Sequence, residues 1–425
     1  MVKRARKVLC LMTAAAILAT GCGTASAPTD GSEESTEAGG VKPVVNGGVV
    51  TMTVGAAEED TELMNQIIAG FKQKYSAEAE FDISIIPMSE SASKDTILNS
   101  IDEAPDVFTF ADDQLAAFVA AGLLVPVENA DEIAARNVEG SVEAASINDK
   151  LYAYPLTADN GYFMYYNKAY FEEADLASLD QILSVAASNG KKVTMDLTSG
   201  WYLYSFFGNT GLTLGLNDDG ISNYCDWNST ENAITGVDVL NAMMAIGTNP
   251  GFQNGGDDVL GDGAANDSVI AGVSGTWKAN ELQEIWGDNL GAVKLPTYTV
   301  AEQQVQMASY AGYKLVGVNH YSENEYWANL FAEYMTNEEN QTLRFSMRGQ
   351  GPSNLNAAES SDVKASVAIQ AVLQQSEFAS LQRVGGEYWE PAGELGSAAI
   401  TGNTEGYGTQ EFLDLIVEGI TKSNS

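Results

Sequence analysis

Histidine and cysteine are nearly absent from this chain. His320 is the one histidine among 425 residues, which excludes most histidine-based catalytic triads and multi-histidine metal sites. Three cysteines occur, and Cys10 and Cys22 lie in an N-terminal segment that we expect to be processed. Cys225 is then a lone internal thiol without a disulfide partner, so the folded body must be stabilised by a large apolar core.

Basic residues are also scarce. Lysine and arginine number 21 against 58 aspartates and glutamates, which gives a formal net charge of −37. Such a chain repels nucleic acid phosphates and anionic membrane surfaces, so we expect no nucleic acid partner and no membrane contact without an anchor. Net charge also serves solubility, so it does not identify the charge of a ligand.

Motifs of the common enzyme classes are absent. The chain has no phosphate-binding loop, nucleophile elbow, paired-histidine zinc motif or dinucleotide-binding glycine pattern. Glycoside hydrolysis needs only two carboxylates, so a secreted carbohydrate-active enzyme stays open as an alternative. Acidic, glycine-rich stretches at 217–220 and 255–267 lack the ligand spacing of calcium loops. We interpret them as solvated turns and expect neither a metal nor a cofactor.

The N-terminal region has the pattern of a targeting segment followed by a tether. A basic start precedes an apolar run from Val8 to Ala19, which is typical of a signal peptide and too short to span a bilayer. We expect residues 1–21 to be removed. Residues 22–48 are rich in serine, threonine, glycine and glutamate, a composition that predicts a flexible tether.

Strand and helix patterns alternate through the body of the chain. Strands are predicted at 49–54, 81–86 and 106–110, with helical spacing at 63–71 and 112–119 between and after them. This alternation favours an α/β fold with a mostly parallel sheet and helices on both faces. The same alternation continues downstream, and a chain of 425 residues is too long for one ordinary core, so two domains are predicted.

A tyrosine-rich stretch at 150–170 lies between the two halves of this pattern. A strand is predicted before Pro155 and a second one after Gly161, ending near Asn167, with a turn over 159–161 between them. We interpret the stretch as the place where the chain crosses from one lobe to the other beside a ligand cleft. A hairpin packed into a core is the alternative, and Tyr162 stays undecided between packing and ligand contact.

Tryptophans beside glycine or short polar residues are the positive signal. Trp277 follows a predicted strand at 268–273, and the carboxyl ends of strands line the crevice of an open α/β sheet. An indole there can stack on the apolar face of a sugar ring while polar neighbours bind its hydroxyls. Trp201 and Trp389 have similar neighbours, and packing is the alternative for all three. The remaining tryptophans are interpreted as packing residues: Trp227, Trp286 and Trp327.

Three segments share their order and spacing with one family. They are Ala104-Pro-Asp-Val-Phe-Thr-Phe-Ala-Asp-Asp-Gln-Leu with Gly122-Leu-Leu-Val-Pro; Leu151-Tyr-Ala-Tyr-Pro-Leu continuing to Tyr166-Asn-Lys; and Gly275-Thr-Trp with Leu295-Pro-Thr. Together they resemble the extracellular solute-binding proteins of ABC transporters, of the maltose/maltodextrin-binding type. Leu18-Ala-Thr-Gly-Cys22 resembles the bacterial lipoprotein box, which implies that Cys22 is the lipid-modified mature N-terminus.

The fold implied by the resemblance is a two-lobed periplasmic-binding-protein type II fold, with a hinge and a ligand cleft between the lobes. Residues 49–157 plus 308–356 are expected to form the N-terminal lobe. Residues 158–307 plus 357–425 are expected to form the C-terminal lobe.

The resemblance also assigns candidate ligand-binding residues in the first lobe. Asp113 matches a carboxylate that hydrogen-bonds sugar hydroxyls. Gln114 falls where the maltose binders carry an arginine, and Phe110 falls where they carry a tryptophan. Glu58 and Glu59 lie in the first β-α loop, where the family uses an aspartate-lysine pair, and the lysine is absent here.

The candidates of the hinge and the second lobe are an acidic position and four aromatic residues. Asp159, or Asn160 with a shift of one residue, matches an acidic residue just past the hinge strand. The aromatic candidates match or adjoin stacking positions of the family: Trp201, Trp277, Tyr388 and Trp389.

The function implied is capture of oligosaccharides, foremost maltose and maltodextrins, by hinge closure and their delivery to ABC permease subunits. The protein would be a monomer held by its lipid anchor at the extracellular face of the cell membrane, and not an enzyme. The alternatives of the same fold are binders of a xylo- or galacto-oligosaccharide, a polyol or a phosphodiester. Few lysines and arginines lie near the predicted cleft, which argues against phosphate.

Overall fold

The computed structural model describes residues 48–217 and 220–422. The predicted signal peptide, Cys22 and nearly all of the predicted tether lie outside these residues, as do two aspartates of the first acidic stretch. Within the described ranges, no helix is both long enough and apolar enough to cross a membrane.

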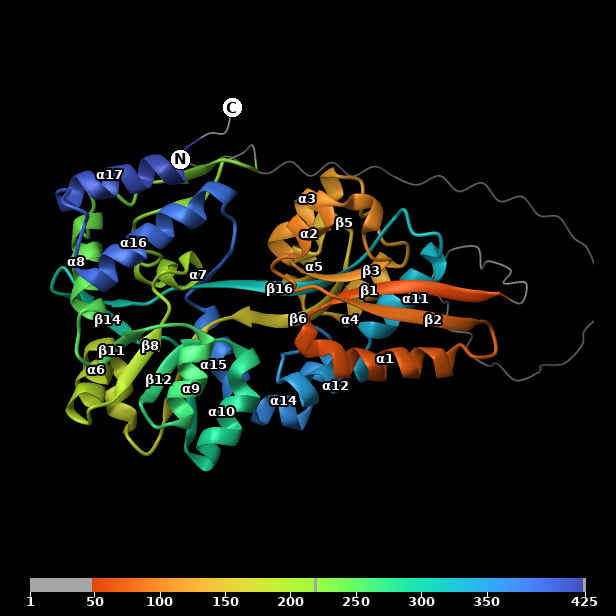
Figure 1. The fold of residues 1–425 in the computed structure, drawn as a ribbon, viewed down its shortest axis with the longest axis horizontal. Helices are drawn as coiled ribbons and strands as arrows, with labels where there is room; N and C mark the ends of the chain where they lie inside the picture. The colour runs from red at the N-terminus through yellow and green to blue at the C-terminus, as the bar shows by residue number, and fades with distance from the viewer. Residues whose placement is uncertain (1–47, 218–219, 423–425) are drawn as a thin grey trace, which may run out of the picture. The chain divides into compact units, whose positions relative to one another are not determined.

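A six-stranded sheet forms the centre of the first lobe, in the order β17-β16-β3-β1-β2, with β6 pairing with β16 (Figure 1). The strands are β1 (Val49–Ala56), β2 (Glu80–Pro87), β3 (Val107–Ala111), β6 (Tyr154–Gly161), β16 (Ser309–Val318) and β17 (Ala379–Leu381). β1 is parallel to β2 and β3, whereas β16 is antiparallel to β3 and β6. The predicted parallel β-α-β core is therefore present; β6 runs in the same direction as this core, and β16 and β17 run against it.

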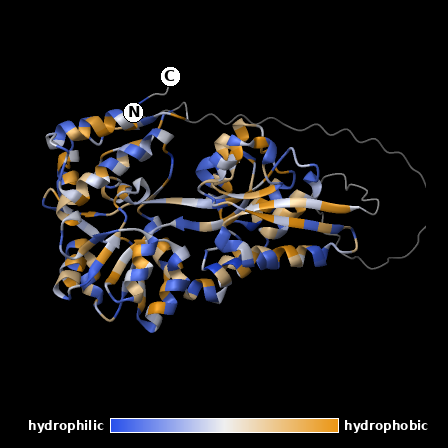
Figure 2. Ribbon diagram, viewed as in Figure 1, coloured by the Kyte–Doolittle hydropathy of each residue, from blue (hydrophilic) through white to orange (hydrophobic). Residues whose placement is uncertain are grey.

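Helices bury their apolar faces against this sheet. They are α1 (Thr61–Lys74), α2 (Ser93–Asn99), α3 (Leu115–Ala120), α4 (Ala130–Arg136), α5 (Glu139–Ala144), α11 (Glu325–Met335) and α12 (Glu338–Arg348). Two short helices that contact neighbouring helices follow, α13 (Leu355–Ala358) and α14 (Ser361–Ala365). In α1 the apolar residues recur at helical spacing, and the ring of Phe71 lies 5.1 Å from that of Phe331 in α11. Figure 2 shows the hydrophobic residues concentrated in β1 and mixed with hydrophilic ones along the helices.

A five-stranded sheet forms the centre of the second lobe, in the order β11-β8-β12-β7-β13. The strands are β7 (Phe163–Asn167), β8 (Lys192–Met195), β11 (Phe252–Asn254), β12 (Val269–Ser274) and β13 (Leu290–Val293). Alternate residues of β7 face opposite sides, with Met164 in one apolar cluster and Phe163 and Tyr165 in another. Both faces of this sheet are therefore covered.

The helices of the second lobe are α6 (Leu179–Ser188), α7 (Gly200–Leu203), α8 (Gly236–Gly247), α9 (Asp257–Ala265), α10 (Ala279–Trp286), α15 (Val367–Ser376), α16 (Trp389–Thr401) and α17 (Thr409–Ile420). Three small hairpins complete the described chain: β4 (Ser146–Ile147) with β5 (Lys150–Leu151), β9 (Leu214–Leu216) with β10 (Asn223–Cys225), and β14 (Thr297–Val300) with β15 (Gln303–Gln306). The prediction of turns over 255–267 was wrong for α9, because Leu260 and Ala264 of this glycine-rich stretch are buried against the sheet.

The sequence predicted a turn at 159–161, but the tyrosine-rich stretch does not turn there. β6 continues through Gly161 because β16 provides a pairing partner along its length, with irregular register near Gly312. Tyr154 near the start of β6 belongs to the core of the first lobe, and Tyr162 just after its end belongs to the core of the second. The strand itself therefore connects the two cores. Its polar residues lie where its pairing with β16 is irregular.

Candidate binding site

A cleft of about 670 Å³ is lined by residues of both lobes, a volume within the usual range of small-molecule sites. The first lobe contributes Glu90, Ser91, Lys94, Asp95, Ala111, Asp113 and Gln114. The crossing strands contribute Asn160 and Lys314, and the second lobe contributes Trp201, Trp277, Gln382, Gly386 and Trp389. A smaller cavity of about 250 Å³ near Tyr152 and Tyr326 contains none of the predicted site residues.

Six of the predicted residues line this cleft together: Asp113, Gln114, Asn160, Trp201, Trp277 and Trp389. Glu90, Lys94 and Lys314 also line the cleft and were not predicted from the sequence. Lys314 carried a usable signal, because a lysine inside an otherwise apolar strand is rarely buried without a polar function. For Glu90 and Lys94, the only indication in the sequence is their position after β2. The loop after β2 lies at the same sheet edge as the loop after β3.

Trp277 is held at its pyrrole edge. It lies in the 3₁₀ turn Thr276–Lys278 that follows β12, and its Nε1–H donates to Asp257 Oδ2 over 2.8 Å. Asp257 is fixed in turn by the Ser274 hydroxyl, which donates to Oδ1 over 2.5 Å. A side chain at Gly275 would overlap the indole, so glycine lets the ring lie close to the backbone. The indole is thus oriented before any ligand arrives.

Trp201 and Trp389 rest on buried tyrosines. The Tyr162 hydroxyl donates to the Trp201 carbonyl over 2.7 Å, and the two rings meet edge-on with centroids 5.5 Å apart. Tyr388 donates to the Gly200 carbonyl over 2.7 Å and meets the Trp389 ring at 5.0 Å. Tyr162 and Tyr388 are fully buried, so in this structure they support the tryptophans from below. The expected ligand contact of Tyr388 is therefore corrected to a packing role.

Two adjacent carboxylates follow β3. Asp113 Oδ2 accepts a hydrogen bond from the Gln382 amide at 2.9 Å. Asp113 is exposed at the cleft surface, but the protein around it still limits its hydration, which raises its pKa to about 6, with a further increase from the neighbouring Asp112 carboxylate and a decrease from Arg383. Asp112 is buried, accepts from the Tyr313 backbone N–H at 2.8 Å and pairs with Arg383 at 3.0 Å. Burial also raises the pKa of Asp112.

Gln114 lines the cleft, but its amide is already engaged. Its Nε2 donates to the carbonyls of Glu90 and Ser91 at 2.8 Å and 3.1 Å. Its Oε1 accepts from the Lys94 backbone N–H at 2.8 Å. Where the resembling family carries an arginine, this chain thus has a side chain that fixes the neighbouring loop.

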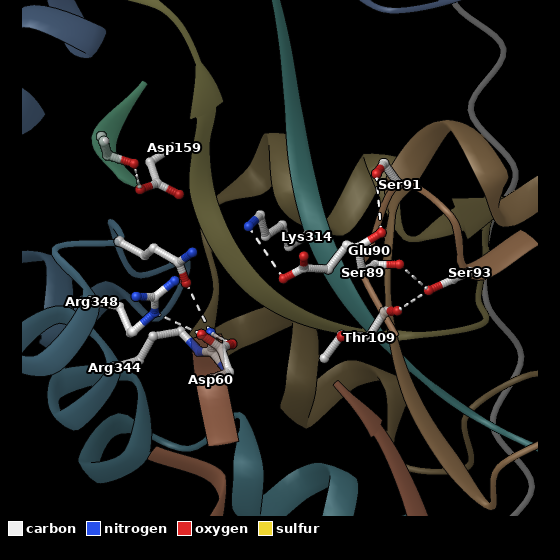
Figure 3. Close-up of polar contacts among 12 residues, drawn as sticks. Asp60, Ser89, Glu90, Ser91, Ser93, Thr109, Asp159, Lys314, Arg344 and Arg348 are labelled. Carbon is white, nitrogen blue, oxygen red and sulfur yellow. Dashed lines mark hydrogen bonds and ion pairs between the residues drawn. The ribbon is translucent and has the colours of Figure 1, made fainter. Parts of the chain in front are cut away.

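The two alternatives for the acidic position, Asp159 and Asn160, occupy different environments in the structure. Asp159, labelled in Figure 3, is buried. It accepts hydrogen bonds from the Thr276 hydroxyl and the Gly351 backbone N–H. Burial raises the pKa of Asp159, and both hydrogen bonds oppose that increase. Asn160 lines the cleft. The carboxylate is therefore a structural link between β6, the segment at 351 and the turn that carries Trp277.

Besides Asp159 and Tyr388, three further predicted residues lie outside the cleft lining. Phe110 is fully buried with its ring 5.1 Å from Phe118, so its expected ligand contact is corrected to core packing. Glu58 and Glu59 are exposed in the 3₁₀ turn before α1, outside the cleft lining. Their neighbour Asp60 does not cap α1 with its side chain, because it pairs with Arg344 and Arg348 (Figure 3).

No cluster of three or more histidine, cysteine, aspartate or glutamate side chains suited to a metal occurs among the described residues. The site instead combines aromatic faces from one lobe with charged and amide groups from the other. Such a surface suits a ligand that has both apolar faces and hydroxyl groups.

The fold and the cleft define a two-lobed α/β binding protein, and comparison with known proteins gives its family. Residues 66–371 match the family described as bacterial extracellular solute-binding protein, and the chain belongs to that family. The galactooligosaccharide-binding protein of Bacillus subtilis (strain 168) is 26% identical over 314 residues, which cover 71% of this chain and 73% of that protein.

Solved structures share the predicted fold. A structure with acarbose superposes with a TM-score of 0.79 at 25% identity, covering 88% of this chain and 99% of that one. The ligand-free maltodextrin-binding protein from L. casei BL23 gives a TM-score of 0.73 at 22% identity, covering 88% and 99%. The maltotriose-binding protein of Thermus thermophilus gives 0.71 at 17%, covering 87% and 99%. The predicted two-lobed periplasmic-binding-protein fold is confirmed.

Proposed function

We propose that this protein captures oligosaccharides, foremost maltodextrins, outside the cell and delivers them to an ABC importer. One observation carries the proposal: three tryptophans of the second lobe share a cleft with Asp113 and Lys314 of the first lobe and the crossing strands. Indole faces stack on sugar rings, and charged groups bind the hydroxyls at the ring edges. Relatives described as galactooligosaccharide- and maltodextrin-binding proteins support this ligand class.

Ligand binding would drive closure of the lobes. A sugar that touches Trp277 and Asp113 at once makes more contacts when the lobes are closed than when they are open, and only this difference shifts the equilibrium. A shift from 1:99 to 99:1 requires about 5.5 kcal/mol of differential binding free energy. Stacking on several indoles together with charge-assisted hydrogen bonds is of that order.

The remaining parts of the proposal concern how the protein is held and what it does not do. Cys22 would carry the lipid, and residues 22–48 would hold a monomeric body at the extracellular face of the membrane. The importer would receive the sugar unchanged, so the protein would not act as an enzyme. A galacto-oligosaccharide is the second candidate ligand, favoured by the relative from Bacillus subtilis.

The test is a thermal-shift and calorimetric panel of malto-, galacto- and xylo-oligosaccharides. We expect maltodextrins to raise the unfolding temperature most, because a ligand that binds only the folded state stabilises it. Trp277→Ala should lose most of this affinity while remaining folded. Binding of maltodextrins unchanged in Trp277→Ala would overturn the role of that indole, and absence of binding to every sugar would overturn the function. New reducing ends appearing at catalytic rates would identify an enzyme instead.

A further inference from the structure

Lys314 and Glu90 form an ion pair in the wall of the cleft. Lys314 lies on β16, where it pairs with Ala111 of β3 and Thr157 of β6. Its Nζ lies 3.2 Å from Glu90 Oε1 (Figure 3). The two side chains are only 14% and 12% exposed, yet both line the cleft. The little surface that they expose is therefore available to a ligand.

The pair has unused hydrogen-bonding capacity. The ammonium group of Lys314 can donate three hydrogen bonds. Among residues 48–217 and 220–422, the hydrogen bond that it donates is to Glu90. A largely buried ion pair loses much of its hydration. Replacing such a pair with apolar side chains of similar size often leaves the stability of the fold unchanged, so stability alone does not explain the pair. A ligand hydroxyl that accepts from Lys314 and another that donates to Glu90 would replace the lost water.

Three hydrogen bonds to Gln114 and Thr109 hold the loop that carries Glu90 in place. The Gln114 amide donates to the Glu90 carbonyl and accepts from the Lys94 backbone N–H. The Ser93 hydroxyl donates to the Thr109 carbonyl over 2.6 Å (Figure 3). Glu90 is therefore positioned before a ligand binds, which lowers the entropic cost of recognition.

The charges of the cleft indicate the chemistry of the recognised group. Glu90, Asp95 and Asp113 line it against Lys94 and Lys314, so carboxylates outnumber ammonium groups and an anionic ligand is disfavoured. A fixed acceptor beside a fixed donor matches two neighbouring hydroxyls of a neutral sugar, because each hydroxyl both donates and accepts.

We propose that Glu90 and Lys314 together recognise adjacent hydroxyls of a sugar unit in the cleft and thereby decide which oligosaccharide is bound. This inference rests on the proposed function and assigns a specificity role to two residues outside the predicted site. Recognition by hydrogen bonds discriminates strongly, because an analogue that lacks the hydroxyl leaves enclosed polar groups without partners.

The test compares Lys314→Met and Glu90→Gln with Lys191→Met as the matched control. Lys191 also pairs with a carboxylate, at 2.7 Å from Asp267, but it lies outside the cleft lining. Calorimetry with maltotriose should show a loss of about tenfold or more for Lys314→Met and Glu90→Gln, since hydrogen bonds to charged groups are of that strength. Lys191→Met should change affinity by less than about threefold, because the lost ion pair does not touch the cleft.

Singly deoxygenated maltotrioses separate recognition from a structural role. Removing the hydroxyl that the pair binds should weaken binding to the unmodified protein and change binding to Lys314→Met very little, while the other deoxy sugars weaken both alike. Equal losses for every analogue, or unchanged affinity in both variants, would overturn the pair's role. If the unmodified protein binds no oligosaccharide, the proposed function fails and this inference falls with it.

Discussion

The indole Nε1–H of Trp277 donates to Asp257 Oδ2 across 2.8 Å, so the first residue of α9 sets the orientation of an aromatic side chain in the cleft. The hydrogen bond uses the edge of the ring and leaves its faces available for stacking. Because Asp257 is itself bonded to Ser274 at the end of β12, the orientation of the ring depends on the sheet. This arrangement preorganises a stacking surface and reduces the entropy lost on binding.

Removing this support should weaken binding without unfolding the protein. We predict that Asp257→Ala lowers affinity for the bound oligosaccharide by about three- to tenfold, the strength of one hydrogen bond to a charged group or less. The neighbouring Asp258→Ala is the control, because Asp258 is exposed on the same helix. Titration calorimetry measures both variants. Equal affinities for Asp257→Ala and Asp258→Ala would show that the ring keeps its orientation without the carboxylate.

A methyl group at position 200 should disturb the platform formed by Trp389. A Cβ at Gly200 would lie 2.9 Å from Tyr388 Cε1 and 3.2 Å from Trp389 Cε3, closer than carbon atoms normally pack. Such overpacking typically costs about 1–3 kcal/mol. We predict that Gly200→Ala lowers both the unfolding free energy and the sugar affinity.

The matched control is Gly408→Ala, where a Cβ would meet no atom within 4 Å. Urea unfolding and calorimetry together separate the two effects. If Gly200→Ala binds sugar as the unmodified protein does, the positions of Tyr388 and Trp389 are tolerant, and Trp389 is not a finely placed contact.

The regular parts of the fold could be predicted because the apolar spacing is unambiguous. Helix α1 shows five apolar residues at helical spacing, all of which are buried, and the three predicted parallel strands of the first lobe are present. Trp227, Trp286 and Trp327 are buried as expected for packing residues. These features depend on local periodicity and on the need to bury apolar surface, and both can be read from neighbouring residues.

The missed features depend on contacts between residues that are distant in the chain. Asn160 and Gly161 suggested a turn, but pairing with β16 keeps them in a strand. Phe110 aligned with a contact residue of the resembling family, but the side chains of successive strand residues point to opposite faces, and its own points into the core. Lys314 meets Glu90 across more than two hundred residues, which no local pattern reveals.

Asp159 should contribute to stability rather than to sugar contact. Its Oδ2 accepts from both the Thr276 hydroxyl and the Gly351 backbone N–H, so Asp159→Ala leaves two buried donors without a partner. We predict a loss of about 2–4 kcal/mol in unfolding free energy, reduced by the release of a poorly hydrated carboxylate. Asp159→Asn keeps one oxygen for both donors and should lose less. Urea unfolding of the two variants measures the difference, and equal stability of Asp159→Ala and the unmodified protein would contradict the assignment.

The pKa of Asp113 predicts opposite effects of pH on stability and on binding. Reduced hydration at the cleft wall and the neighbouring Asp112 raise this pKa to about 6, while Arg383 and Lys94 oppose the increase. A raised carboxyl pKa means that the folded state holds the proton more tightly than the unfolded chain. The ligand-free protein should therefore lose some stability as pH rises from about 4 to about 6.

Sugar binding should respond in the other direction, because the ionised carboxylate is the stronger acceptor for a hydroxyl. Below the pKa, binding must displace a proton, so affinity should fall about tenfold between pH 7.5 and pH 5 if ionised Asp113 is required. Calorimetry in two buffers of different ionisation enthalpy should also detect proton release near pH 6.

Asp113→Asn is the control that assigns this dependence to one group. The variant should bind more weakly than the unmodified protein at pH 7.5, with an affinity that hardly changes down to pH 5. A steep profile that persists in Asp113→Asn would assign the titration to another group of the cleft. A flat profile in the unmodified protein would mean that the sugar binds equally well to the protonated and the ionised form of Asp113. The hydrogen bond from Gln382 to Asp113 would then be kept in the complex and not be exchanged for one from the sugar.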